Sequence, residues 1–206
     1  MGAAQVSICR RVPLLALLLV GVFLSPSSRA QRGSLTLPQN LGELVAQAAT
    51  VVQGHVASAR IEPHPDFANL STVVVTFRVE QVLKGEADLT FTFRQYVWDV
   101  RDRYDAAGYR KGQHLLLLLT RPSRYGLSSP VGLSQGRFRI QPDTQGRSAA
   151  LNGVANAGLF RGLMPTLRKR GITLAADQVS LLETHRSGPI PLDALETLIR
   201  RLAAGR

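Results

Sequence analysis

A serine between two glycines is the clearest pattern in this sequence that could carry out catalysis. Gly132-Leu133-Ser134-Gln135-Gly136 matches G-x-S-x-G, in which a serine nucleophile lies on a strained turn between a strand and a helix. A hydrolase also needs an acid and then a histidine, and Asp143 or Asp177 followed by His185 gives that order. However, the motif follows a loop and precedes a strand pattern. We therefore predict a non-enzymatic protein and keep a serine hydrolase centred on Ser134 as an alternative.

Residues that could bind a metal ion are the second candidate. The histidines are His55, His64, His114 and His185, without the close spacing that is typical of zinc sites. Asp99, Asp102 and Asp105 recur every third residue but lack the ligand and glycine spacing of an EF-hand calcium loop. The arginines between these aspartates are more simply explained as their ion-pair partners. The sequence thus predicts no metal site and no cofactor.

Basic and aromatic residues are interleaved in the middle of the chain. OB barrels use such mixtures to follow a charged polymer while aromatic rings stack on bases or sugars. The predicted basic face consists of Arg94, Tyr96, Trp98, Arg101, Arg103, Tyr109, Arg110, Lys111, Arg137 and Arg139. A solvated basic surface with tyrosines packed at its edge is the alternative interpretation.

The N-terminus has the three parts of a cleavable signal peptide. Arg10 and Arg11 precede an apolar run over 12–24, and Ser28-Arg29-Ala30 places small residues where the signal peptidase requires them. The apolar run is shorter than the roughly 20 residues of a membrane-spanning helix. We expect cleavage near Ala30 and a secreted or periplasmic protein, exported by the general secretory or the twin-arginine route. The mature protein would then contain no cysteine, because Cys9 lies in the signal.

The net charge favours acidic partners. Of 25 basic residues three precede the expected cleavage point, so 22 remain against 14 acidic residues, a formal charge of +8. This charge could steer the protein toward anionic glycans, lipid head groups or nucleic acid, of which export makes nucleic acid an unlikely partner. A composition rich in arginine, alanine, leucine and glycine is equally typical of a GC-rich bacterial genome.

Short strands dominate the sequence after residue 50. Five strand patterns cover 51–61, 72–83, 89–98, 115–119 and 137–140. In the third, the apolar alternation changes phase from Phe91 and Phe93 to Tyr96 and Trp98, which predicts a bulge or a sharp bend that helps a sheet to curl. Without helix-length spacers between the strands, an antiparallel barrel or sandwich is expected.

Helices are predicted on either side of these strands. Asn40 followed by Glu43 forms a capping-box pattern that should begin a short helix reaching about Ala48. Pro191 should begin a C-terminal helix with one apolar face. The expected organisation is a signal peptide at 1–30, a barrel domain at 31–141, a linker at 142–158 and a helical extension at 159–206. The amphipathic start of this extension is expected to pack on the barrel or, alternatively, to lie on an anionic membrane.

Three stretches within about 44–138 carry a resemblance to a known family, namely 48–56, 76–85 with its Leu83-Lys84-Gly85 ending, and 112–119. Together they resemble the netrin-like domain of the tissue inhibitors of metalloproteinases. The resemblance implies a mainly β fold, a five-stranded antiparallel OB-like barrel with a short helix near its start. It also implies an inhibitor or accessory protein of a secreted protease. Those inhibitors use several disulfides and an N-terminal cysteine, whereas the mature chain here would begin at Gln31 and have no cysteine.

These observations lead to one functional hypothesis and two alternatives. We expect an exported, non-enzymatic binding module that engages an unknown protein or an anionic polymer outside the cytoplasm, with no transmembrane span in the mature protein. The alternatives are the protease inhibitor or accessory protein and the serine hydrolase.

Overall fold

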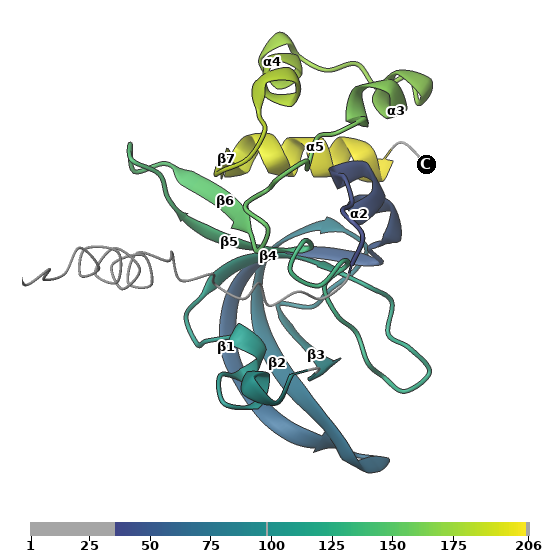
Figure 1. Cartoon of the computed structure of the whole chain (residues 1–206), viewed down its shortest axis with the longest axis vertical. Helices are drawn as coiled ribbons and strands as arrows, with labels where there is room; N and C mark the ends of the chain where they lie inside the picture. The colour runs from purple at the N-terminus through teal and green to yellow at the C-terminus, as the bar shows by residue number, and fades with distance from the viewer. Residues whose placement is uncertain (1–35, 98, 205–206) are drawn as a thin grey trace, which may run out of the picture. The chain divides into compact units, whose positions relative to one another are not determined.

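Seven antiparallel strands form one open sheet in the order β3-β2-β1-β4-β5-β6-β7 (Figure 1). The computed structural model describes residues 36–97 and 99–204, so the predicted signal peptide and Trp98 lie outside the described residues. The strands are β1 (Thr50–His64), β2 (Phe67–Lys84), β3 (Thr90–Tyr96), β4 (His114–Leu119), β5 (Arg137–Pro142), β6 (Ser148–Asn152) and β7 (Ile190–Pro191). The α-helices are α2 (Leu41–Gln47), α3 (Leu163–Lys169), α4 (Ala176–Thr184) and α5 (Leu192–Ala204), and two short 3-10 helices, η1 (Val100–Arg103) and η2 (Ala106–Gly108), lie between β3 and β4.

The mainly β character of the chain is confirmed, but the closed five-stranded barrel is not. The sheet has seven strands and does not close on itself. One isolated bridge joins Arg94 of β3 to Leu127 in the loop between β4 and β5, and Ser128 N donates to Arg94 O at 2.8 Å. Two further strands, β6 and β7, extend the sheet beyond the five that the sequence predicted.

The capping box at the start of α2 is confirmed. The side chain of Asn40 accepts from the backbone N–H of Glu43, and the Glu43 carboxylate accepts from the backbone N–H of Asn40. At the other end of the helix, the Lys84 ammonium donates to the carbonyls of Val45 and Ala48. A cation at this position satisfies carbonyl groups that have no partner within the helix. The Leu83-Lys84-Gly85 segment therefore joins the end of β2 to α2.

The irregularities of the sheet lie in the pairing of β1 with β2 and not in β3. The pairing of β1 with β2 shifts register four times along the strands, once between Gln53 and Gly54. By contrast, β3 pairs with β2 without interruption from Thr72↔Tyr96 to Arg78↔Thr90. The predicted bulge in β3 was wrong because buried Gln95 continues the inward face of Phe93, with its side-chain oxygen accepting from the buried Tyr109 hydroxyl at 3.0 Å.

The segment 142–158, expected as a linker, contains β6. It begins with a tight turn in which the Asp143 carboxylate accepts from the backbone N–H groups of Gln145 and Arg147 at 2.8 and 2.9 Å. Gly146 supplies the positive φ of 76° that the turn requires. The turn directs β6 back along β5, where Ala149 and Ala150 are buried. Small side chains carry little apolar signal, which is why the sequence pattern did not indicate this strand.

Two apolar clusters lie on opposite faces of the sheet. One contains Val52, Val56, Phe77, Phe93, Leu115 and Leu117. The other contains Leu116, Leu118 and Phe138 together with buried residues of α2, α3, α4 and α5. Figure 1 shows α5 across one end of the sheet, with α2 beside it and α3 and α4 beyond it. Since neighbouring side chains of a strand point to opposite faces, the unbroken apolar run of β4 contributes leucines to both clusters.

The C-terminal helix buries the apolar face predicted for it, namely Leu192, Leu195, Leu198, Ile199 and Leu202. The preceding segment also packs into the core, because Leu159, Phe160, Leu163 and Leu167 are buried. This packing agrees with the expected contact with the sheet and leaves those side chains inside the protein. Within residues 36–97 and 99–204, no helix has the length and apolar character to cross a membrane.

Glu196 on α5 should make stability depend on pH. Burial raises its pKa, and the Arg200 guanidinium at 3.4 Å only partly opposes this effect. A carboxyl group with a raised folded-state pKa binds its proton more tightly in the folded protein, so it destabilises the fold as pH rises above about 4.3, the ordinary value for glutamate. We expect Glu196→Gln to raise the free energy of unfolding by about 0.5–1 kcal/mol at pH 7. Urea denaturation at pH 7 and pH 3.5 should show this gain disappearing at the lower pH, and an equal gain at both would contradict the burial argument.

Candidate functional site

Three side chains that are far apart in the sequence meet on adjacent strands β2, β1 and β4. His55 of β1 lies directly opposite His114 of β4 in the ladder, and Glu80 projects from β2 on the other side of β1. His55 Nδ1 lies 2.8 Å from Glu80 Oε1, and His114 Nε2 lies 3.3 Å from Glu80 Oε2. The imidazole rings stack with centroids 4.2 Å apart and planes 14° from parallel. We call these residues the His55–Glu80–His114 cluster.

The cluster is accessible from solvent but held by the sheet. The side chains of His55, Glu80 and His114 are 31%, 40% and 25% exposed. Partial burial lowers the pKa of His114, and the nearby His55 lowers it further, while the Glu80 carboxylate acts in the opposite direction. Each of the three residues offers a ligand atom, and these atoms lie within 4.8 Å of one another.

The other two histidines lie outside the cluster and contact neighbouring residues of the fold. His64 is buried, its Nε2 lies 2.8 Å from Tyr125 O, and its Nδ1 accepts from Asp66 N at 3.1 Å. His185 packs edge to face against Phe160, with ring centroids 5.5 Å apart. The sequence pattern does not indicate the cluster, because His55 and His114 become neighbours only through the register of β1 and β4. The available signal was that both lie in, or next to, predicted strands.

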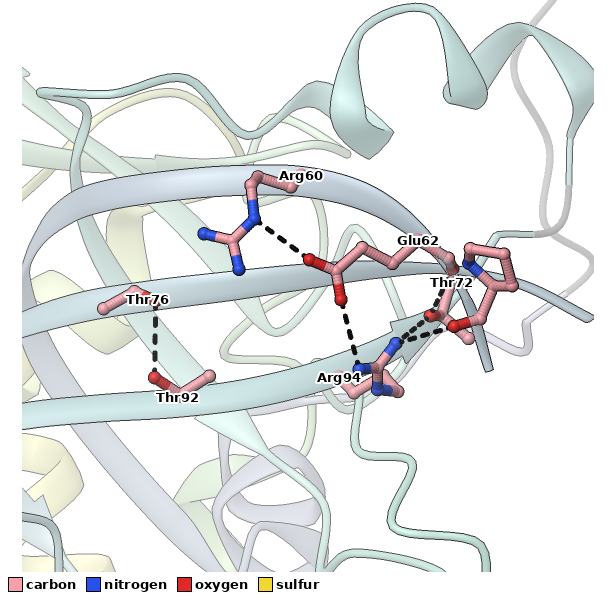
Figure 2. A network of polar contacts seen from close by, with 7 residues as sticks. Arg60, Glu62, Thr72, Thr76, Thr92 and Arg94 are labelled. Atoms are coloured by element: carbon pink, nitrogen blue, oxygen red, sulfur yellow. Dashed lines mark hydrogen bonds and ion pairs between the residues drawn. The ribbon is translucent and has the colours of Figure 1, made fainter. Parts of the chain in front are cut away.

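The residues predicted to form one basic surface do not all lie on the same face of the sheet. Arg94 alternates with Phe93 of the first apolar cluster and therefore points to the opposite face. There its guanidinium donates to Thr72 Oγ1 at 2.7 Å, to Pro63 O at 3.2 Å and to Glu62 Oε2 at 3.3 Å. Figure 2 shows this network, which also includes the Arg60–Glu62 ion pair. The hydrogen bond from Arg60, with help from Arg94, lowers the pKa of Glu62, so Arg94 already has a carboxylate partner.

A second group of the predicted residues does come together. Tyr109 is buried, and burial raises its pKa. The Arg137 guanidinium lies over the Tyr109 ring, 4.7 Å from its centroid, and donates to Ala107 O at 2.8 Å. These contacts hold the loop between β3 and β4 against β5. Arg110 and Lys111 follow Tyr109 in that loop, and Arg139 lies two residues after Arg137 on β5.

The exposed cations beside the Arg137–Tyr109 contact form what we call the β5 basic surface, namely Arg110, Lys111 and Arg139. Within the described part of the chain none of these three makes an ion pair. Arg103 is also exposed, Tyr96 is half-buried on β3, and the side chain of Arg101 lies outside the described residues. Asp105 of the same loop accepts from Gly108 N at 3.1 Å.

The G-x-S-x-G segment forms a turn that enters β5 directly, with no helix after it. Gln135 of this segment is buried. Its side-chain oxygen accepts from Gln39 N at 2.8 Å, and its amide donates to Thr36 Oγ1 and Leu37 O at 3.1 Å. Ser134 is half-buried, and its carbonyl accepts from Gly153 N at 2.9 Å. The segment thus joins the chain before α2 to the loop after β6.

Comparison of the chain with protein-family models, curated proteins and solved structures finds no match.

Proposed function

We propose that this chain is an exported, non-enzymatic binding module whose β5 basic surface engages an acidic polymer. The observation that carries the proposal is that Arg110, Lys111 and Arg139 are exposed and have no ion-pair partners among the described residues. Arg139 pairs with Leu115 of β4, and Arg110 and Lys111 belong to the loop that leads into β4 and that Arg137 contacts. An unpaired, solvated cation can exchange water and counterions for the charges of a polymer without first losing a protein partner. Release of the polymer's counterions then favours binding.

The contacts beneath this surface support a fixed arrangement. The Arg137 guanidinium lies over the Tyr109 ring and donates to the carbonyl of Ala107. These two contacts hold the loop between β3 and β4 in place. A surface held in one conformation loses less conformational entropy on binding than a mobile loop does. Arg137 is therefore a positioning residue, and the three exposed cations are the proposed contacts.

The netrin-like OB fold is also part of this proposal. Strands β3-β2-β1-β4-β5 have β1 at their centre, and the bridge from Arg94 to Leu127 brings the β4–β5 loop to β3. Both features are compatible with a partly open, five-stranded OB barrel. In that interpretation α2 is the short helix near the start of the fold, and β6, β7, α3, α4 and α5 are additions. They enlarge the apolar cluster that contains Leu116, Leu118 and Phe138.

The test is a charge-matched comparison on the full chain with dextran sulfate as the acidic polymer. We expect Arg110→Gln, Lys111→Gln and Arg139→Gln together to weaken binding at least about tenfold at 0.1 M salt. The slope of log K against log salt should also become shallower by about two to three, since three contacts are lost. The control carries Arg168→Gln, Lys169→Gln and Arg186→Gln, which remove the same charge from exposed positions in and after the helices. Equal weakening in both variants would show that net charge alone is responsible and would contradict the proposal.

A further inference from the structure

We propose that the His55–Glu80–His114 cluster binds a divalent transition-metal ion through two imidazole nitrogens and one carboxylate oxygen. This site is separate from the β5 basic surface and does not depend on it. Two histidines and one acidic residue form a common ligand set for zinc and for other first-row divalent ions.

The distances between the possible ligand atoms fit a zinc site after small movements of the side chains. Zinc bonds of about 2.0–2.1 Å place the ligand atoms of a tetrahedral site roughly 3.3 Å apart. The carboxylate oxygens of Glu80 lie 2.8 Å from His55 Nδ1 and 3.3 Å from His114 Nε2, and one ligand atom from each residue lies within 4.8 Å of the others. Since the three residues project from adjacent hydrogen-bonded strands, their backbones are already positioned for a shared ion.

The contacts of His114 Nε2 are compatible with this site. This nitrogen lies 3.0 Å from Gln53 Nε2 and 3.3 Å from Glu80 Oε2. An unprotonated imidazole nitrogen offers one lone pair, so an ion bound at Nε2 would replace the contact with the Gln53 amide. The Glu80 carboxylate can only accept, and its oxygen lies close enough to Nε2 to coordinate the same ion.

The remaining coordination positions would face solvent. The three side chains are between 25% and 40% exposed, so water has access to an ion held by them. Structural zinc sites are usually closed by four protein ligands, whereas sites with three ligands retain a position for water or for another ligand. The geometry therefore points to a site that can exchange its outer ligand and not to a purely structural one.

Isothermal titration of the full chain with Zn²⁺, prepared without a polyhistidine tag, tests this proposal. We expect one equivalent to bind, and His114→Ala and Glu80→Gln each to weaken that binding at least about tenfold. His185→Ala is the matched control, because it removes a half-buried histidine outside the cluster, and it should leave the affinity unchanged. Circular dichroism confirms that each variant is folded.

A second measurement requires no variant. On addition of Zn²⁺, the ring C–H signals of two of the four histidines in the proton NMR spectrum should shift, and those of the other two should not. A flat titration would show that the cluster does not bind Zn²⁺, and this result would overturn the proposal. Binding that survives in His114→Ala and is lost in His185→Ala would overturn it as well.

Discussion

Replacing Gly54 by alanine should lower the free energy of unfolding by at least about 3 kcal/mol, among the largest effects expected of a single substitution. A Cβ atom at this position would lie 2.0 Å from the carbonyl oxygen of Arg78 and 3.1 Å from the backbone nitrogen of Glu80. Both are backbone atoms of the paired strand, so no side chain can rotate away to make room. We expect β1 and β2 to separate locally where their register shifts.

Gly112→Ala is the matched control for Gly54→Ala. Gly112 has a φ of 82°, and a Cβ built on it meets no atom within 4 Å. Its substitution therefore costs only the conformational strain of alanine in the left-handed region, about 1–2 kcal/mol. Urea denaturation of the two variants and the parent chain measures both losses. If Gly54→Ala lowers the free energy of unfolding no more than Gly112→Ala does, then close packing of β1 and β2 does not explain why glycine is required at position 54.

Asn156→Ala should destabilise the protein by about 3–5 kcal/mol, the second large effect. Asn156 is fully buried, and its side-chain oxygen accepts from Asn152 N at 3.0 Å. Its amide donates to Ala150 O at 2.9 Å and to Gly188 O at 2.8 Å. Alanine would remove the partner of three backbone groups at once, two of which are buried. Asparagine also tolerates the φ of 56° found here better than alanine does.

Asn156→Gly separates these two contributions. Glycine adopts a positive φ at no steric cost, but it removes the same three side-chain hydrogen bonds. We expect Asn156→Gly to be more stable than Asn156→Ala by about 1 kcal/mol and still much less stable than the parent chain. Thermal unfolding followed by circular dichroism gives the order of the three proteins. A glycine variant as stable as the parent would show that the hydrogen bonds contribute little.

Features determined by residues close together in the sequence could be predicted. The capping box of α2 depends on Asn40 and Glu43, three positions apart, and the apolar face of α5 repeats with the helical period. The long alternation of β2 likewise indicated its buried face. In each case the pattern and the contact lie within one element, so no knowledge of strand pairing was needed.

Features that depend on strand register could not be predicted in this way. Gln95 interrupts the apolar pattern of β3, yet it lies on the buried face because Tyr109, from a distant loop, donates to it. His55 and His114 have no sequence spacing that indicates a site, because the β1–β4 ladder alone places them together. The predicted basic residues were divided for the same reason, since alternation sends Arg94 and Arg137 to opposite faces of the sheet.

The position of β4 beside β1 also has a consequence for how the protein folds. β1 and β2 are neighbours along the chain and can pair through a short turn, whereas β4 follows only after β3 and the loop with its two 3-10 helices. Closing that longer segment carries a greater entropic cost, and pairings between distant parts of a chain slow folding. His55 and Glu80 can therefore meet as soon as the first hairpin forms, while His114 joins them only when β4 docks. The completed cluster would report on that long-range step, so its assembly could serve as a kinetic probe of when the central sheet becomes continuous.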